Sequence, residues 1–131
     1  MEEGKTILVV EDERMLLRAW RHFLEKSSYS VLSAENGEDA IQIYLGHQDR
    51  IGLILLDLGL PKIGGREVYL KVKEVNPKAK VLIISGYLDP DLLAEMQRLG
   101  ARDFLQKPLL PEKVLEKIQE VLDRPTVPSS N

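Results

Sequence analysis

Short apolar runs alternate with amphipathic stretches along this chain. The runs are rich in leucine or β-branched residues and are bounded by turn-forming residues, a pattern typical of strands. The predicted strands span residues 6–10, 30–34, 53–57, 80–85 and 103–106. Apolar residues between and after them recur at helical spacing, and the first such stretch has Leu16, Trp20, Phe23 and Leu24 on one face. Proline followed by an acidic residue, at Pro90 and Pro111, favours the start of two further helices.

The run at residues 53–57, LILLD, is apolar on both faces and ends on a carboxylate, Asp57. Strands of this kind belong in a parallel sheet that helices cover on both sides, and right-handed β-α crossovers produce that architecture. The sequence therefore predicts an α/β fold with three layers. We expect one domain over residues 1–123, and a polar, proline-containing tail or linker stub at residues 124–131.

Composition excludes several classes of function. A chain of 131 residues without cysteine has neither disulfides nor thiolate metal sites nor a thiol nucleophile. Its net charge of −3 argues against a dedicated nucleic-acid surface. Arg66 and the lysines at 71, 73, 78 and 80 are interleaved with Glu67 and Glu74, which favours a solvated face. We expect no membrane span, no signal peptide and a cytoplasmic location.

Polar and charged residues stand where the predicted strands end. The carboxyl ends of parallel strands meet at one edge of a sheet, which is where ligands bind in such folds. Glu11 and Asp12 follow the first strand, Asp57 ends the third, Ser85 ends the fourth and Lys107 follows the fifth. The sequence thus predicts that three carboxylates, one hydroxyl and one ammonium group converge.

Asp57 alone could be a helix cap or the partner of a lysine. Packed against Glu11 and Asp12, however, it would be repelled unless a cation intervened. Oxygen ligands suit Mg²⁺, and we expect Glu11, Asp12, Asp57 and the backbone carbonyl of Gly59 to surround it. These groups are suited to phosphoryl transfer onto a carboxylate, with Asp57 attacking while Mg²⁺, Lys107 and Ser85 each cover one phosphoryl oxygen.

The segments VVEDE, LLDLGLP, IISGY and DFLQKP, in this order and at these separations, resemble the receiver domain of bacterial two-component response regulators. The resemblance covers the chain up to about residue 123 and implies a doubly wound sheet with the flavodoxin-like strand order 2-1-3-4-5. It implies that Asp57 accepts the phosphoryl group, that Asp12 touches the metal and that Glu11 acts through water. It also implies that Phe104 is the aromatic switch residue and that the Lys107–Pro108 peptide bond is cis.

The family resemblance further implies a signalling switch rather than an enzyme. The expected partners are a histidine kinase or a histidine phosphotransfer protein, and an output partner that the sequence does not identify. Phosphorylation would change the face formed by the fourth helix, the fifth strand and the fifth helix, through which a weak homodimer could also form.

Two other classes of protein share part of this pattern. A phosphatase of the haloacid-dehalogenase type also places an Asp nucleophile and Mg²⁺ after a strand, but it needs a second Asp two residues later, where this chain has Gly59. A flavodoxin-like electron carrier is disfavoured because carboxylates at the edge of the sheet would repel the phosphate of FMN.

Overall fold

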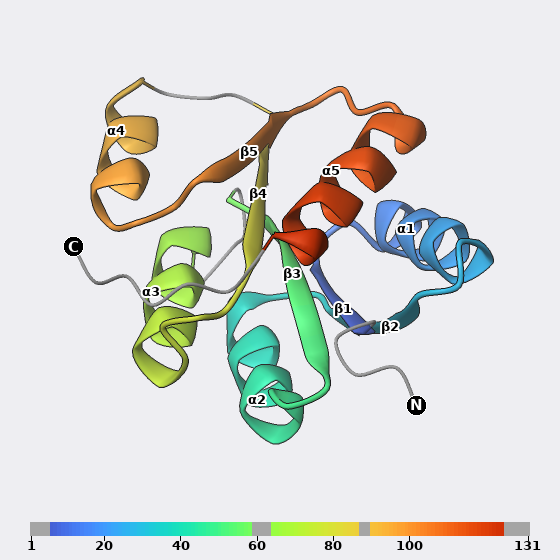
Figure 1. Cartoon of the computed structure of the whole chain (residues 1–131), viewed down its shortest axis with the longest axis horizontal. Coiled ribbons are helices and arrows are strands. Elements are labelled where there is room, and N and C mark those ends of the chain that lie inside the picture. The colour runs from blue at the N-terminus through green and yellow to red at the C-terminus, as the bar shows by residue number, and fades with distance from the viewer. Residues whose placement is uncertain (1–5, 59–63, 87–89, 125–131) are drawn as a thin grey trace.

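Strands and helices alternate strictly in the computed structural model, which describes residues 6–58, 64–86 and 90–124 (Figure 1). The strands are β1 (Thr6–Val10), β2 (Ser30–Ala34), β3 (Ile51–Asp57), β4 (Val81–Ser85) and β5 (Asp103–Gln106). The helices are α1 (Arg14–Lys26), α2 (Gly37–His47), α3 (Gly65–Val75), α4 (Pro90–Arg98) and α5 (Pro111–Asp123). The predicted β-α alternation is confirmed, including the helix starts at Pro90 and Pro111.

The strands form one parallel sheet in the order β2-β1-β3-β4-β5, which confirms the predicted fold and strand order. The central strand β3 is buried from Leu53 to Asp57. Both faces of β3 are shielded from solvent because helices cover both sides of the sheet.

Alternate residues of the central strands point into two separate apolar cores. Ile54 and Leu56 of β3 pack with α2, α3 and α4, whereas Leu53 and Leu55 pack with α1 and α5. The period-two alternation of a strand therefore fixes which helices lie on which face of the sheet.

Some boundaries differ from the sequence predictions. β3 begins at Ile51, two residues earlier than predicted, and β4 begins one residue later, at Val81. On α1 the predicted Trp20 and Leu24 are buried, whereas Leu17, which was not predicted, is buried in place of the half-buried Leu16. Arg124, which the sequence assigns to the tail, is hydrogen-bonded to Asp103 at the start of β5.

None of the helices in the described ranges combines the length and the apolar character needed to cross a membrane.

Candidate functional site

The backbone of the sheet brings the ends of four strands to one edge. Asp57 is the last residue of β3 and Ser85 the last of β4, and the register pairs Asp57 with Ile84 and Ser85 with Gln106. The backbone N–H of Lys107 donates a hydrogen bond of 2.8 Å to the Ser85 carbonyl oxygen. The position of the Lys107 backbone is therefore set by the neighbouring strand.

Three carboxylates meet at this edge, as predicted. One carboxylate oxygen each from Glu11, Asp12 and Asp57 lies within 4.8 Å of the other two. Glu11 and Asp57 are buried, with 4% and 7% of their surface exposed, whereas Asp12 is exposed. The donor set is therefore made only of oxygen and is open to solvent on the Asp12 side, which fits Mg²⁺ with several retained waters.

Lys107 is the cation closest to the carboxylates among the described residues. Its Nζ donates a 3.1 Å hydrogen bond to Asp57 Oδ2 and lies 3.7 Å from Glu11 Oε1. Burial lowers the pKa of Lys107, but the hydrogen bond and charge of Asp57, with a contribution from Glu11, outweigh burial and raise it. The lysine therefore stays charged at this edge.

Glu11 lies in an environment that disfavours its ionised form. Burial and the neighbouring charge of Asp57 raise the pKa of Glu11 from 4.5 to about 7, against the opposing effects of the Glu13 N–H and Lys107. The backbone N–H of Glu13 donates a 3.2 Å hydrogen bond to Glu11 Oε2 and orients the carboxylate. One lysine thus compensates this carboxylate cluster incompletely, and a bound divalent cation would relieve the repulsion.

The remaining residues predicted for the site differ in where the structure places them. Ser85 is buried at the same edge, at the end of β4. Gly59, the predicted carbonyl ligand, lies outside the described residues. Glu13, which follows the acidic pair Glu11 and Asp12, is the N-cap residue of α1 and is exposed. The Lys107–Pro108 peptide bond is cis, as predicted.

Phe104, the predicted switch residue, lies three positions before Lys107 on β5. It pairs with Ile83 in the sheet and packs, half-buried, against the core on the α2, α3 and α4 side. Phe104 therefore lies on the same strand as the segment that leads to Lys107, and its side chain is on the side of the sheet that α4 covers.

Gly65 is a residue that sequence reasoning missed. A Cβ atom at this position would lie 2.7 Å from Leu58 Cα and 3.0 Å from the Asp57 carbonyl oxygen, both backbone atoms. Only glycine lets the first turn of α3 approach the end of β3 so closely. The Gly64-Gly65 pair at the start of a predicted helix was the available sequence signal.

A comparison with family profiles decides the identity of this fold and site. The profile described as response regulator receiver domain matches residues 7–119. The chain belongs to the response regulator receiver domain family. Receiver domains are modules of two-component phosphorelay signalling, and the acidic cluster is consistent with the phospho-aspartate site of such a domain.

Two known proteins with a similar sequence differ in how much of their length this chain covers. The chain is 26% identical over 119 residues to the chemotaxis protein CheY of Thermotoga maritima, covering 90% of this chain and 98% of that protein. It is 33% identical over 117 residues to a cyclic di-GMP phosphodiesterase of the same organism, covering 89% of this chain. The chain spans only 31% of the length of that phosphodiesterase.

Solved structures share the fold of this receiver domain. The CheX–CheY–BeF₃–Mg²⁺ complex from Borrelia burgdorferi contains a chain that matches with a TM-score of 0.84 and 26% identity. The match covers 91% of this chain and 90% of that chain. In that complex Mg²⁺ is named as a component, and in the present receiver domain the acidic triad is able to hold a metal.

Proposed function

We propose that this receiver domain is a phosphorylation-dependent switch that accepts a phosphoryl group on Asp57. The observation that carries the proposal is the position of Asp57, at the end of a buried strand, 3.1 Å from Lys107 and within the carboxylate triad. A nucleophile must be held in one geometry, and a strand buried on both faces holds it rigidly.

The reaction is a transfer between a phosphohistidine and a carboxylate. An oxygen of Asp57 attacks phosphorus, an O–P bond forms, the N–P bond of the donor breaks and the imidazole leaves. The Lys107 ammonium, which already contacts Asp57, donates to a phosphoryl oxygen, and the Ser85 hydroxyl donates to another. A carboxylate nucleophile, unlike a hydroxyl or a thiol, needs no separate general base.

Glu11, Asp12 and Asp57, together with the Gly59 carbonyl, are the proposed ligands of Mg²⁺. When bound, Mg²⁺ supplies positive charge that offsets the charge on the phosphoryl oxygens. Glu11 and Asp12 contribute by holding that charge next to Asp57, and Glu13 contributes the backbone N–H that orients Glu11.

The output follows from the position of Phe104. A phosphoryl group adds close to two negative charges at the edge and draws Ser85 and Lys107 toward it. Movement of Ser85 opens space that Phe104 fills by turning inward, and the face formed by α4, β5 and α5 changes shape. Phosphorylation shifts a population between two packings, and a shift from 1:99 to 99:1 requires about 5.5 kcal/mol of differential binding.

A histidine-phosphorylated protein is the proposed donor. An apolar hollow of about 480 Å³ lies directly beside Lys107 and is lined by Leu16, Trp20 and Leu109, among others. Next to it, Met15 and Leu110 expose 81% and 63% of their surface. A partner that brings phosphohistidine to Asp57 must contact the surface around the site. The exposed apolar side chains on that surface favour such docking.

The alternative class is a phosphatase that turns over foreign phosphate esters. It lacks support here because Gly59 stands where the second Asp would serve as general acid. Without that acid the phospho-aspartate is a stored signal and not a step in the turnover of a substrate.

Mass spectrometry of the intact protein after treatment with acetyl phosphate and Mg²⁺ tests the proposal. The unmodified sequence should gain one phosphoryl group, Asp57→Asn should gain none, and the matched exposed variant Asp49→Asn should label normally. Lys107→Ala should still label. Labelling of Asp57→Asn would identify another nucleophile, and steady release of p-nitrophenol from p-nitrophenyl phosphate would favour the phosphatase.

A further inference from the structure

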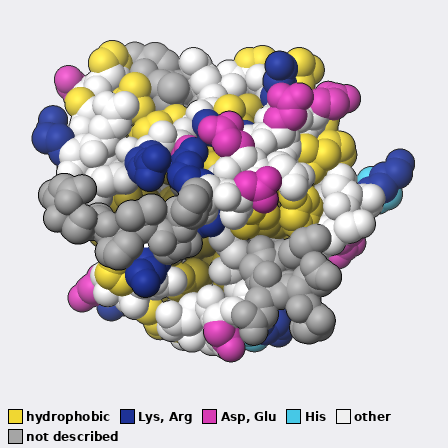
Figure 2. Space-filling model, viewed as in Figure 1, with side chains coloured by type: hydrophobic (Ala, Val, Ile, Leu, Met, Phe, Trp, Pro, Cys, Tyr) yellow, Lys and Arg dark blue, Asp and Glu magenta, His cyan; other side chains and the backbone are white. Residues whose placement is uncertain are grey.

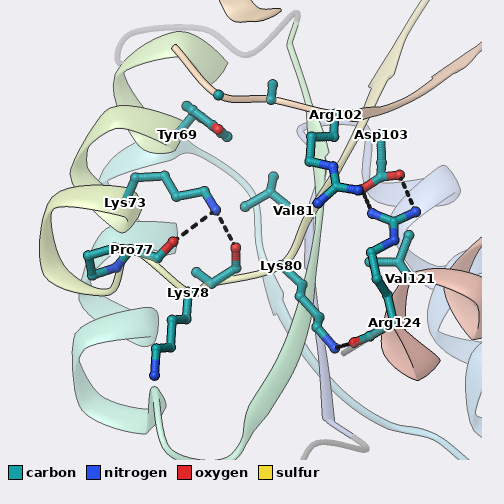
Figure 3. A pocket seen from close by; sticks show the side chains of 13 residues that line it. Tyr69, Lys73, Pro77, Lys78, Lys80, Val81, Arg102, Asp103, Val121 and Arg124 are labelled. Atoms are coloured by element: carbon teal, nitrogen blue, oxygen red, sulfur yellow. Dashed lines mark hydrogen bonds and ion pairs between the residues drawn. The ribbon is translucent and has the colours of Figure 1, made fainter. Parts of the chain in front are cut away.

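A polar cavity lies at the amino ends of the strands, at the end of the sheet opposite to Asp57. It has a volume of about 160 Å³ and is enclosed by the end of α3, the starts of β4 and β5 and the end of α5 (Figure 3). Tyr69, Val81, Ala101 and Val121 contribute its apolar lining. Because it adjoins the amino ends of the strands, no group of the carboxylate site takes part in it.

The charge of this cavity is opposite in sign to that of the whole chain. Of the described residues that line it, five are cationic and one is anionic; the cations are Lys73, Lys78, Lys80, Arg102 and Arg124, and the anion is Asp103. The whole chain has a net charge of −3. Figure 2 shows several Lys and Arg side chains close together on the viewed face, on the side of α3. Such a local concentration of positive charge attracts anions.

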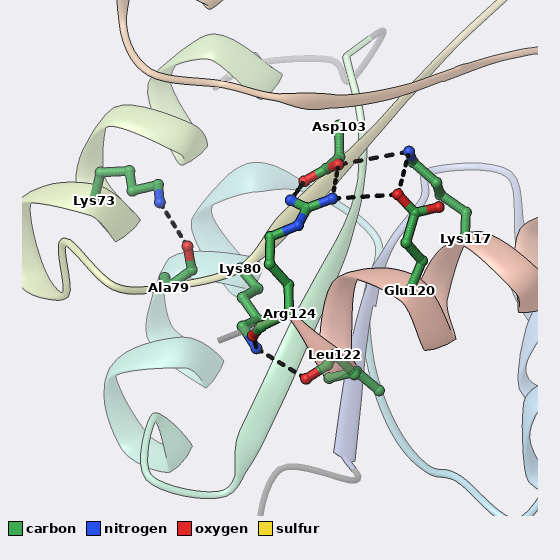
Figure 4. Close-up of polar contacts among 8 residues, drawn as sticks. All are labelled: Lys73, Ala79, Lys80, Asp103, Lys117, Glu120, Leu122 and Arg124. Atoms are coloured by element: carbon green, nitrogen blue, oxygen red, sulfur yellow. Dashed lines mark hydrogen bonds and ion pairs between the residues drawn. The ribbon is translucent and has the colours of Figure 1, made fainter. Parts of the chain in front are cut away.

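The carboxylate of Asp103 is already satisfied by other residues. It accepts two hydrogen bonds from Arg124, of 2.9 and 3.1 Å, and lies 3.7 Å from the Lys117 ammonium (Figure 4). Among the described residues its ion pairs are with Arg124 and Lys117 and not with Arg102. Within residues 6–58, 64–86 and 90–124, neither Lys73 nor Arg102 forms an ion pair with a carboxylate.

Lys73 and Lys80 are held in place by backbone carbonyls and each retains hydrogen-bonding capacity. Lys73 Nζ donates to the carbonyl oxygens of Ala79, at 2.6 Å, and Pro77, at 3.4 Å. Lys80 Nζ donates to those of Leu122, at 3.0 Å, and Arg124, at 2.8 Å. An ammonium group has three N–H bonds, and the described carbonyls use two on each lysine. The Lys73 ammonium also lies 5.8 Å from the centre of the Tyr69 ring, a cation–π contact that an added anion would leave in place.

Lys73 and Arg102 also repel each other. Burial and the charge of Arg102 lower the pKa of Lys73, and the smaller opposing effect of Asp103 does not cancel them. An anion between these two cations would remove the repulsion and accept hydrogen bonds from both. Charge-assisted hydrogen bonds to phosphate oxygens are among the stronger polar interactions in proteins.

We propose that this cavity binds the phosphate or diphosphate group of a small phosphorylated molecule, with Lys73 and Arg102 as its principal contacts and Lys80 at its side. The volume of about 160 Å³ admits such a group. Pockets that enclose a whole drug-sized ligand measure about 300–1,000 Å³. The rest of the molecule would therefore lie outside the cavity. The proposal is independent of phosphorylation at Asp57, which lies at the other edge of the sheet.

An NMR titration of ¹⁵N-labelled protein with diphosphate, without Mg²⁺ and at constant ionic strength, tests this proposal. We expect saturable shifts of the backbone amides at residues 79, 80 and 81 and at residues 101, 102 and 103. Arg102→Gln should weaken binding about tenfold, the loss expected when one charge-assisted contact is removed. Lys71→Gln is the matched control, because Lys71 is on the same helix as Lys73, pairs with Glu74 and does not line the cavity.

Titrations with inorganic phosphate and ADP distinguish the sources of the phosphate group. Tighter binding of ADP than of diphosphate would support a nucleotide, and equal binding would support recognition of the phosphate groups alone. Shifts that do not saturate, that occur equally with chloride, or that are the same in Arg102→Gln and Lys71→Gln would overturn the proposal. Arg102 is exposed, so its substitution leaves the fold intact, and Asp57→Asn should bind diphosphate here as the unmodified sequence does.

Discussion

The Lys107 ammonium lies 3.1 Å from Asp57 Oδ2, although the two residues are 50 positions apart in the sequence. The same ammonium lies 3.7 Å from Glu11 Oε1. One lysine therefore shares its charge between two of the three carboxylates that are able to hold a metal ion. Lys107 and a divalent cation would therefore compete for the same two carboxylates.

Removing the lysine charge should strengthen metal binding. We expect Lys107→Met to bind Mg²⁺ about tenfold more tightly, because about 1.4 kcal/mol of competing attraction is enough for that change and the pair is only partly exposed. Trp20, the single tryptophan, lines the hollow beside Lys107, and its fluorescence can report the titration. Lys113→Met, at an exposed lysine, is the control. Unchanged or weaker Mg²⁺ affinity in Lys107→Met would contradict this competition.

Removing the exposed carboxylate should have the opposite effect. We expect Asp12→Asn to weaken Mg²⁺ binding at least about tenfold, since a neutral amide is a poor substitute for a charged ligand. The fold should be unaffected because Asp12 is exposed. Glu13→Gln is the matched control, as Glu13 is the neighbouring exposed acid and does not belong to the triad. Isothermal titration calorimetry measures both; equal loss in the two variants would argue against a specific site.

The two phenylalanines of the chain allow the switch to be tested. Phe104→Leu should still be phosphorylated by acetyl phosphate, but the accompanying amide shifts of α4 and β5 should shrink at least twofold, because leucine lacks the ring that we propose turns inward on phosphorylation. Phe23→Leu is the control, since Phe23 is also half-buried but packs in the core on the α1 and α5 side. If both variants give full shifts on phosphorylation, Phe104 is not the switch residue.

The approach of α3 to β3 predicts a large difference between two glycine substitutions. Gly65→Ala should destabilise the fold by about 1–3 kcal/mol, because its Cβ would meet the backbone of Leu58 and Asp57. Gly46→Ala, in the exposed part of α2 with nothing within 4 Å of the new Cβ, should stabilise it by about 0.5–1 kcal/mol. Urea unfolding measures both. An unchanged free energy of unfolding in Gly65→Ala would mean that α3 can move away from the end of β3 without loss of stability.

The buried carboxylate at the start of β5 depends on Arg124. We expect Arg124→Met to lower the free energy of unfolding by about 1–3 kcal/mol, because Asp103 is buried and would keep Lys117 as its one ionic partner among the described residues. Arg14→Met removes a solvent-exposed Arg–Glu pair with Glu35 and should change stability by less than about 0.5 kcal/mol. Equal effects of the two substitutions in thermal unfolding would show that burial of Asp103 adds nothing to the pair.

The fold, and the three carboxylates that meet at the edge of the sheet, could be predicted from the sequence alone. Strand and helix periodicities do not depend on distant contacts, and strict alternation with buried strands leaves few sheet topologies. Since parallel strands end at one edge, the positions of Asp57, Glu11 and Asp12 in the sequence already implied that they meet.

Tertiary packing decided what the sequence left open. Leu17 is buried and Leu16 only half-buried because the orientation of α1 on the sheet is set by the whole core, and a periodic pattern does not distinguish two neighbouring apolar residues at the border of the buried face. The close approach at Gly65 and the partnership of Arg124 with Asp103 join segments that are distant or assigned to different regions. The cationic cavity likewise arises only when the ends of α3 and α5 meet the starts of β4 and β5, because its cations come from three separate stretches of the chain, at residues 73–80, 102 and 124.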